Sequence, residues 1–157
     1  MNRQQNYDRV EANQLDALQH WGILKIDDEK LEAGHGRSLA DPYDASEPLT
    51  DRVASYLHTN CSHCHVKEGG GNSQFAVAYP ADTESMRLLD AEPQHDRYGL
   101  SNAKLIAPGH PQRSVLLHRI AHRGRGQMPP LATSLVDQRA TELIRQWIES
   151  LKPTDRR

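Results

Sequence analysis

Apolar residues recur at the spacing of an α-helix in four stretches of the chain. Each stretch predicts an amphipathic helix, and together they cover residues 10–21, 48–60, 114–121 and 136–151. In the second stretch, Leu49, Val53 and Leu57 follow one another every four residues, so one face of that helix is apolar. This helix runs directly into the segment that contains both cysteines of the chain.

The helix predicted for residues 136–151 has recognisable signals at both ends. Asp137 is a candidate N-cap, because a carboxylate accepts a hydrogen bond from the free backbone N–H groups of a first turn. Pro153 follows the helix and prevents its continuation. Its apolar stripe consists of Ala140, Leu143, Ile144, Trp147, Ile148 and Leu151. We expect Trp147 to pack between this helix and the helix of residues 48–60.

The remaining segments contain weaker signals. Residues 1–47 are interpreted as an N-terminal arm or linker with one helix, which packs on the domain formed by residues 48–157. Residues 73–79 and 100–106 each resemble a short strand, and together they predict a small β-hairpin inserted in that domain.

Composition limits the classes of protein to which the chain can belong. Only 36% of its 157 residues are hydrophobic and 5% are aromatic, which is little material for a large core. No apolar run approaches the ~20 residues of a membrane span. A net charge of −2 argues against a general nucleic-acid binder. Two explanations follow: either part of the chain is unstructured, or a group other than side chains helps to fill the interior.

The two cysteines provide the strongest functional signal. Cys61, Cys64 and His65 form the pattern C-x-x-C-H, which is the attachment motif of c-type haem. Two thiols one helical turn apart can each add to a vinyl group of the haem, and the following imidazole can then bind the iron. The sequence therefore predicts one covalent haem c per chain, with His65 as an axial ligand.

Two other chemistries use cysteines at this spacing. A thioredoxin-like redox pair has a βαβ context, which the chain lacks. A zinc site is the second alternative, because Cys61, His63, Cys64 and His65 are all potential ligands. Structural zinc usually takes a second pair of ligands from a separate segment, and no such pair is evident in the sequence.

A second axial ligand is expected for an electron-transfer haem, and a methionine thioether favours the reduced iron. Met128 is the main candidate, because the two prolines that follow it stiffen a loop and prevent a helix there. His122 and Met86 are weaker candidates.

The combination of these motifs resembles class I cytochrome c. The resemblance covers residues 47–152 and rests on the helix that ends in C-x-x-C-H, the Pro108-Gly109-His110-Pro111 segment, the Met128-Pro129-Pro130 loop and a final helix with Trp147. More narrowly, these segments resemble haem domains at the C-terminal end of larger bacterial and planctomycete proteins, some of them quinoprotein-like dehydrogenases. The resemblance implies an all-α fold around a covalent haem, with Cys61 and Cys64 as the thioether links and His65 and Met128 as iron ligands.

Function and location follow as expectations from the same resemblance. The chain is expected to be an electron carrier and not itself an enzyme, receiving electrons from a redox partner protein or a fused dehydrogenase domain. The alternative is a haem enzyme or a redox or ligand sensor with an open or exchangeable distal site. Because haem c is attached outside the cytoplasm, we expect a periplasmic protein whose targeting segment lies upstream of this sequence.

Four arginines precede the Met128 loop with no acidic residue between them: Arg113, Arg119, Arg123 and Arg125. They form either a solvated face or a functional group of charges. In the second case one or more of them, with Arg119 as the main candidate, pairs with the haem propionates or steers a redox partner. Trp147 is a further candidate for packing against the haem.

Overall fold

The computed structural model describes residues 4–25, 38–70, 75–79 and 86–152. Contacts divide the chain into two compact units, Met1–Ala40 and Asp41–Arg157. Residues 41–47 thus belong to the second unit. There, the guanidinium of Arg52 donates to the carbonyl of Pro42 at 2.9 Å, and the hydroxyl of Tyr43 donates to the carboxylate of Asp137.

The first unit contains a β-hairpin followed by a short helix. Strand β1 (Gln4–Asn6) pairs antiparallel with β2 (Glu11–Asn13), and helix α1 (Gln14–His20) follows directly. The predicted helix of residues 10–21 therefore begins four residues late. Asp8 takes a positive φ of 62° and closes the turn of the hairpin, so the residues before Gln14 are held in an extended conformation.

The prediction of an all-α fold is wrong. The structure is 33% helical, with four α-helices and a two-stranded antiparallel sheet in the part of the chain that it describes. Besides the unpredicted hairpin, the described parts of the connections between the helices of the second unit are mostly without regular structure. Several non-glycine residues in these connections have a positive φ, in the left-handed region of backbone conformation. This conformation interrupts both helices and extended segments. The residues are Glu68, Arg87, Asp90, Tyr98, Asn102 and Ala132.

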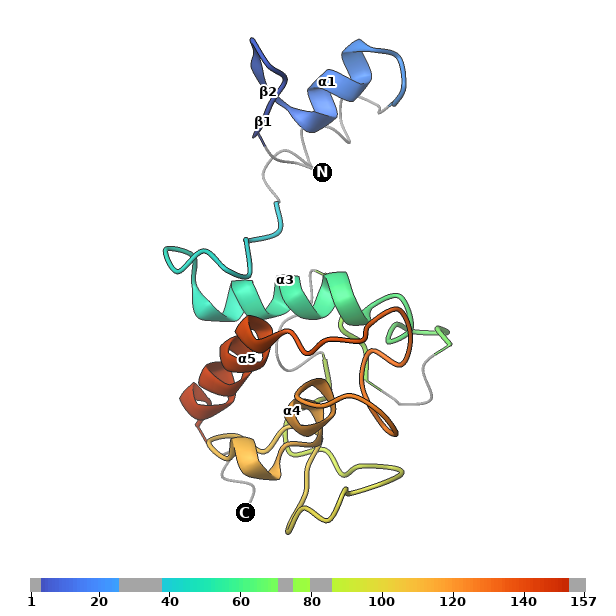
Figure 1. Ribbon diagram of the computed structural model, residues 1–157, viewed down its shortest axis with the longest axis vertical. Helices are drawn as coiled ribbons and strands as arrows, with labels where there is room; N and C mark the ends of the chain where they lie inside the picture. Colours follow the sequence, from blue (N-terminus) through green and yellow to red (C-terminus); the bar gives the residue numbers. More distant parts are fainter. Residues whose placement is uncertain (1–3, 26–37, 71–74, 80–85, 153–157) are drawn as a thin grey trace. The chain divides into compact units, whose positions relative to one another are not determined.

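The three predicted helices of the second unit are confirmed. Helices α3 (Leu49–Cys61) and α5 (Gln138–Ser150) pack against each other, and α4 (Val115–Ile120) packs on α5 (Figure 1). A 3-10 turn, η1 (Pro111–Arg113), precedes α4. Val53, Ile144 and Ile148 are almost completely buried in the core between these helices. Among the described residues, no helix has both the length and the apolar character that a membrane span requires.

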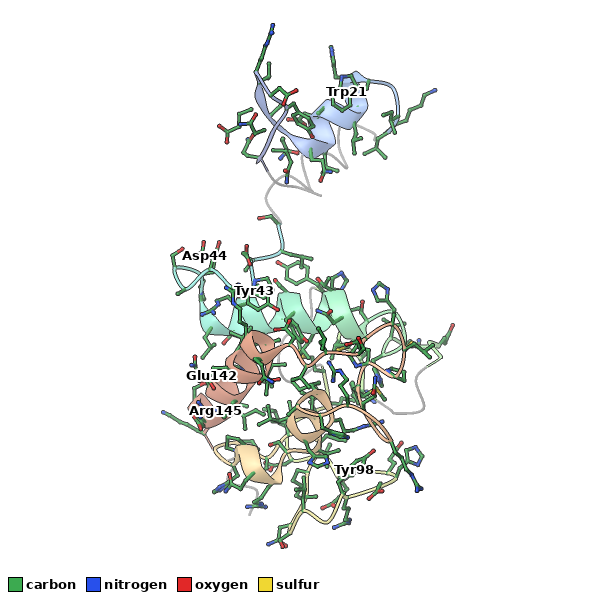
Figure 2. All side chains as sticks on the ribbon, in the orientation of Figure 1. Trp21, Tyr43, Asp44, Tyr98, Glu142 and Arg145 are labelled. Atoms are coloured by element: carbon green, nitrogen blue, oxygen red, sulfur yellow. The ribbon has the colours of Figure 1, made fainter. Side chains whose placement is uncertain are left out.

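The outer side of α5 is polar, as the amphipathic pattern predicts. Arg145 forms ion pairs with Glu142 at 2.6 Å and with Glu149 at 2.5 Å, all within one helix (Figure 2). These pairs are exposed and contribute little to stability. The buried stripe on the opposite side is what anchors the helix.

The predicted hairpin between residues 73–79 and 100–106 is wrong in the region that can be compared. Residues 73–74 lie outside the described residues, and residues 75–79 form no strand. Ile106 instead makes an isolated parallel bridge with Leu89, and Lys104 makes another with Ser114. Ile106 is completely buried, so burial of its side chain decides its backbone partner.

Asp137 joins the start of α5 to the segment before α3. Its carboxylate accepts from the backbone N–H of Ala140 at 3.0 Å, as the predicted N-cap, and also from the hydroxyl of Tyr43. Burial, followed by this hydrogen bond, raises the pKa of Tyr43, so the hydroxyl remains a donor at neutral pH.

Asp137→Ala is therefore expected to lower the free energy of unfolding by about 2–3 kcal/mol, because it removes both the helix cap and the acceptor for Tyr43. Tyr43→Phe removes only the hydroxyl and should cost about 1 kcal/mol. Urea denaturation followed by circular dichroism measures both values. Equal losses for the two variants would contradict the assignment of the cap.

Candidate functional site

The C-x-x-C-H motif lies where helix α3 ends. Cys61 is the last residue of the helix, and its carbonyl accepts from the backbone N–H of Cys64 at 3.2 Å and of His65 at 2.9 Å. Cys61 is half-buried and Cys64 is exposed. The helical turn thus holds the two thiols and the imidazole in one short segment, as the spacing predicts.

Gly69 allows the chain to turn closely behind the motif. A Cβ atom at this position would lie 2.5 Å from the carbonyl oxygen of Cys64 and 2.8 Å from a methyl group of Val66. Both distances are too short for a side chain. The turn of the motif therefore depends on a glycine here.

The pKa of Cys61 is shifted in the opposite direction to that of the reactive cysteine in thiol redox enzymes. Burial, with a smaller contribution from Cys64, raises the pKa of the Cys61 thiol to about 11. Catalytic C-x-x-C pairs have a nucleophilic cysteine with a lowered pKa. Cys61 does not have this property.

His65 is held in place through both its backbone and its ring. Its carbonyl accepts from the N–H of Val77 at 2.9 Å, and its imidazole stacks on Phe75 with a centroid distance of 4.2 Å and an interplanar angle of 12°. Burial, and then the charge of Arg119, lower the pKa of His65. Both effects favour the neutral imidazole, which is the form that binds metals.

Sequence reasoning missed Phe75 as a site residue. Phe75 is the single phenylalanine of the chain, and this could have drawn attention to it. The stretch that contains it was interpreted only as a strand. Its contact with His65 depends on how the loop after the motif folds back, which no local pattern reveals.

Met128 lies in the loop between α4 and α5. Its backbone N–H donates to the carbonyl of Arg119 at 2.9 Å, and its side chain packs against the hydrophobic core. The peptide bond between Met128 and Pro129 is cis. Gly126, two residues earlier, has a φ of 83°, and a Cβ atom there would lie 2.6 Å from the ring of Tyr98. The loop therefore passes close to Tyr98 just before Met128.

Two cavities that share part of their walls bring the motif and the loop together. One of about 360 Å³ is lined by Cys61, Cys64, His65, Arg119 and Met128. Its other walls are mostly apolar, and include Leu88, Leu105, Val115, Leu116, Ile120, Pro129, Pro130 and Leu131. A second cavity of about 620 Å³ also contains His65, Arg119 and Met128 in its wall. Both volumes are in the range of cofactor sites.

The larger cavity has the more polar wall. Besides the residues that it shares with the smaller cavity, it is lined by Arg87, Glu92, Gln94, His95, Asp96 and Tyr98. An elongated group with an apolar body and a polar edge would match the two cavities together.

Most of the four arginines contact the protein backbone. Arg113 donates to the carbonyl of Asn102 at 3.1 Å, and Arg119 to that of Gly126 at 2.8 Å. Arg123 donates to the carbonyl of Leu135 through two nitrogens, at 2.7 and 3.0 Å. Through these hydrogen bonds the arginines connect loops to α4 and to the residues next to it. The prediction of a solvated face did not include such contacts. Of the four, Arg119 lines both cavities.

Three other candidates lie away from the cavity walls. Trp147 is 2% exposed in the core formed by the helices, where the apolar stripe predicted it, and it lines neither cavity. Met86 is buried in the same core and His122 packs on His118, and neither lines these cavities. Of the two methionines that the structure describes, Met128 is the one that shares a wall with His65.

The donor set fits an iron porphyrin better than a bare metal ion. His65 and Met128, which carry an imidazole and a thioether, line the same mainly apolar cavity as Cys61 and Cys64, and Arg119 adds a positive charge to its wall. No cluster of three or more His, Cys, Asp or Glu side chains suited to a metal ion occurs in the described ranges. Structural zinc usually needs four such ligands.

Comparison with known proteins found no match to a family model, to a curated protein or to a solved structure.

Proposed function

We propose that this chain binds one c-type haem through thioether bonds to Cys61 and Cys64 and functions as an electron carrier, with His65 and Met128 as the axial ligands. The observation that supports this proposal is the common cavity wall to which Cys61, Cys64, His65 and Met128 all belong. These four residues come from two segments that lie far apart in the sequence.

When bound, the haem supplies an iron that alternates between the ferric and the ferrous state. The side chains of this chain would set the conditions for that change. With haem bound, the thioether of Met128 and the apolar wall would favour the less charged ferrous form, because both disfavour an additional positive charge. Arg119 would provide a compensating charge for acidic groups on the haem.

The alternative function is a haem enzyme or sensor with an open distal position. Met128 lines both cavities together with His65, which supports a six-coordinate carrier instead. The partner would be a redox protein or a fused dehydrogenase domain. We place this function in the periplasm, because haem of this type is attached outside the cytoplasm.

Absorption spectra of the full chain, produced in a host that attaches haem c, test the proposal. We expect haem that stays bound on a denaturing gel, a low-spin ferric spectrum with the charge-transfer band of a thioether–iron bond, and no rapid reaction with peroxide. Covalent haem with a high-spin ferric spectrum would favour the enzyme or sensor. A chain that takes up no haem would contradict both functions.

A further inference from the structure

The side-chain amide of Gln127 bridges the two ends of the loop that contains Met128. Its oxygen accepts from the backbone N–H of Gly124 at 2.7 Å. Its nitrogen donates to the carbonyls of Pro129 at 3.1 Å and Thr133 at 3.2 Å. One side chain therefore connects the backbone before Met128 to the backbone after it.

The far half of this loop is not anchored in the hydrophobic core of the protein. Leu135 is 81% exposed, and Leu131, which is 79% exposed, lines the smaller cavity and not the core. The segment is held by hydrogen bonds instead, from Gln127 to Pro129 and Thr133 and from Arg123 to Leu135. Of these, the bonds of Gln127 lie nearest to Met128 along the chain.

Gln127 itself lies outside the walls of both cavities. Any effect that it has on a bound group must therefore pass through the loop residues that line the smaller cavity, which are Met128 and the three residues after it. The backbone N–H of Met128 is bonded to Arg119, and Arg119 also bonds Gly126, so the chain before Met128 is anchored to α4. The amide of Gln127 extends this anchorage to the chain after Met128.

We propose that Gln127 is a positioning residue that keeps the thioether of Met128 at the iron. The inference rests on the proposed function, since it takes Met128 as the axial ligand. Loss of the two bonds donated by the Gln127 amide would leave the backbone directly after Met128 less restrained, since the bonds of Arg123 hold only Leu135 farther along the loop. The sulfur would then leave the iron more often, and a small ligand from solution would compete more successfully for the position.

Gln127→Glu tests this inference with little change in shape. A carboxylate can still accept from Gly124, but it cannot donate to Pro129 or Thr133. Gln127→Leu, which removes all three bonds without a charge, is the second variant. Gln112→Glu is the matched control, because it makes the same change at an exposed residue of η1 outside both cavities.

Two measurements on the haem-loaded protein are decisive: the thioether–iron charge-transfer band, and the affinity of the ferric protein for added imidazole. For both Gln127 variants we expect a weaker band and an imidazole affinity that rises by about 10-fold or more, the factor expected from the loss of two ordinary hydrogen bonds. The control should stay within about 2-fold of wild type, as expected for an exposed surface substitution.

A purely structural role for Gln127 predicts a different result. In that case the urea midpoint of both variants would fall, while the band and the imidazole affinity of the folded protein would equal those of wild type. That result overturns the inference and leaves the proposed function intact. A wild-type chain without the thioether–iron band would overturn both.

Discussion

Replacing Met128 with alanine is expected to open the distal position of the haem. The thioether band should disappear, the ferric spectrum should become high-spin, and the affinity for cyanide should rise by roughly 100-fold or more, because no internal ligand competes for the iron. Absorption spectra and cyanide titrations of the variant and wild type measure these changes. No other residue so directly separates a carrier from an enzyme or sensor.

Met86→Ala is the matched control for this experiment. Met86 is 3% exposed in the core and lies outside both cavity walls. Its truncation should cost about 2–5 kcal/mol of stability and leave the thioether band unchanged. If the band survives in Met128→Ala but is lost in Met86→Ala, the assignment of the axial ligand is wrong.

Replacing both cysteines with serine is expected to abolish covalent attachment. Haem should no longer migrate with the chain on a denaturing gel, since Cys61 and Cys64 are the only cysteines. Each single variant should keep one thioether bond and so retain the haem colour on the gel. The double variant should also unfold at a lower urea concentration, because a large apolar group no longer fills the cavity between the motif and the Met128 loop.

Ser62→Ala provides the control within the motif. The hydroxyl of Ser62 donates to the carbonyl of His58 at 2.6 Å, so its removal perturbs the same turn without removing a thiol. Covalent haem should remain at the wild-type level in this variant. Covalent haem in the cysteine double variant would show that the attachment involves other residues.

The sequence predicted the helices of the second unit well, because they are locally determined. The apolar stripe of α5 and the cap at Asp137 are encoded within one stretch, and the structure has both. The N-terminal hairpin was missed because its strands are short and largely exposed, with no alternation of apolar and polar residues to reveal them. The inserted hairpin was predicted wrongly because Ile106 pairs according to its burial next to Leu89.

Some residues of the candidate site could likewise be predicted from the sequence, and others could not. Cys61, Cys64 and His65 were recognisable from spacing, since one helical turn brings them together. The prolines after Met128 indicated a stiff loop, but not where the loop lies. No local sequence pattern indicated the contacts of Phe75 and Gln127. Phe75 stacks on the ring of His65, and Gln127 bonds to the backbone of Pro129, and both contacts form only when the loops fold.

By itself, the sequence determined the motif at the end of α3, the helices that support it and the small amount of apolar material available for a core. Only the tertiary structure decided that Met128 shares a cavity wall with His65, that Trp147 stays in the core between the helices, and that most of the four arginines hold loops. The physical reason is the range of the interactions. Helical spacing and caps act within a few residues, whereas a cavity wall and a loop clamp exist only when distant segments are packed together.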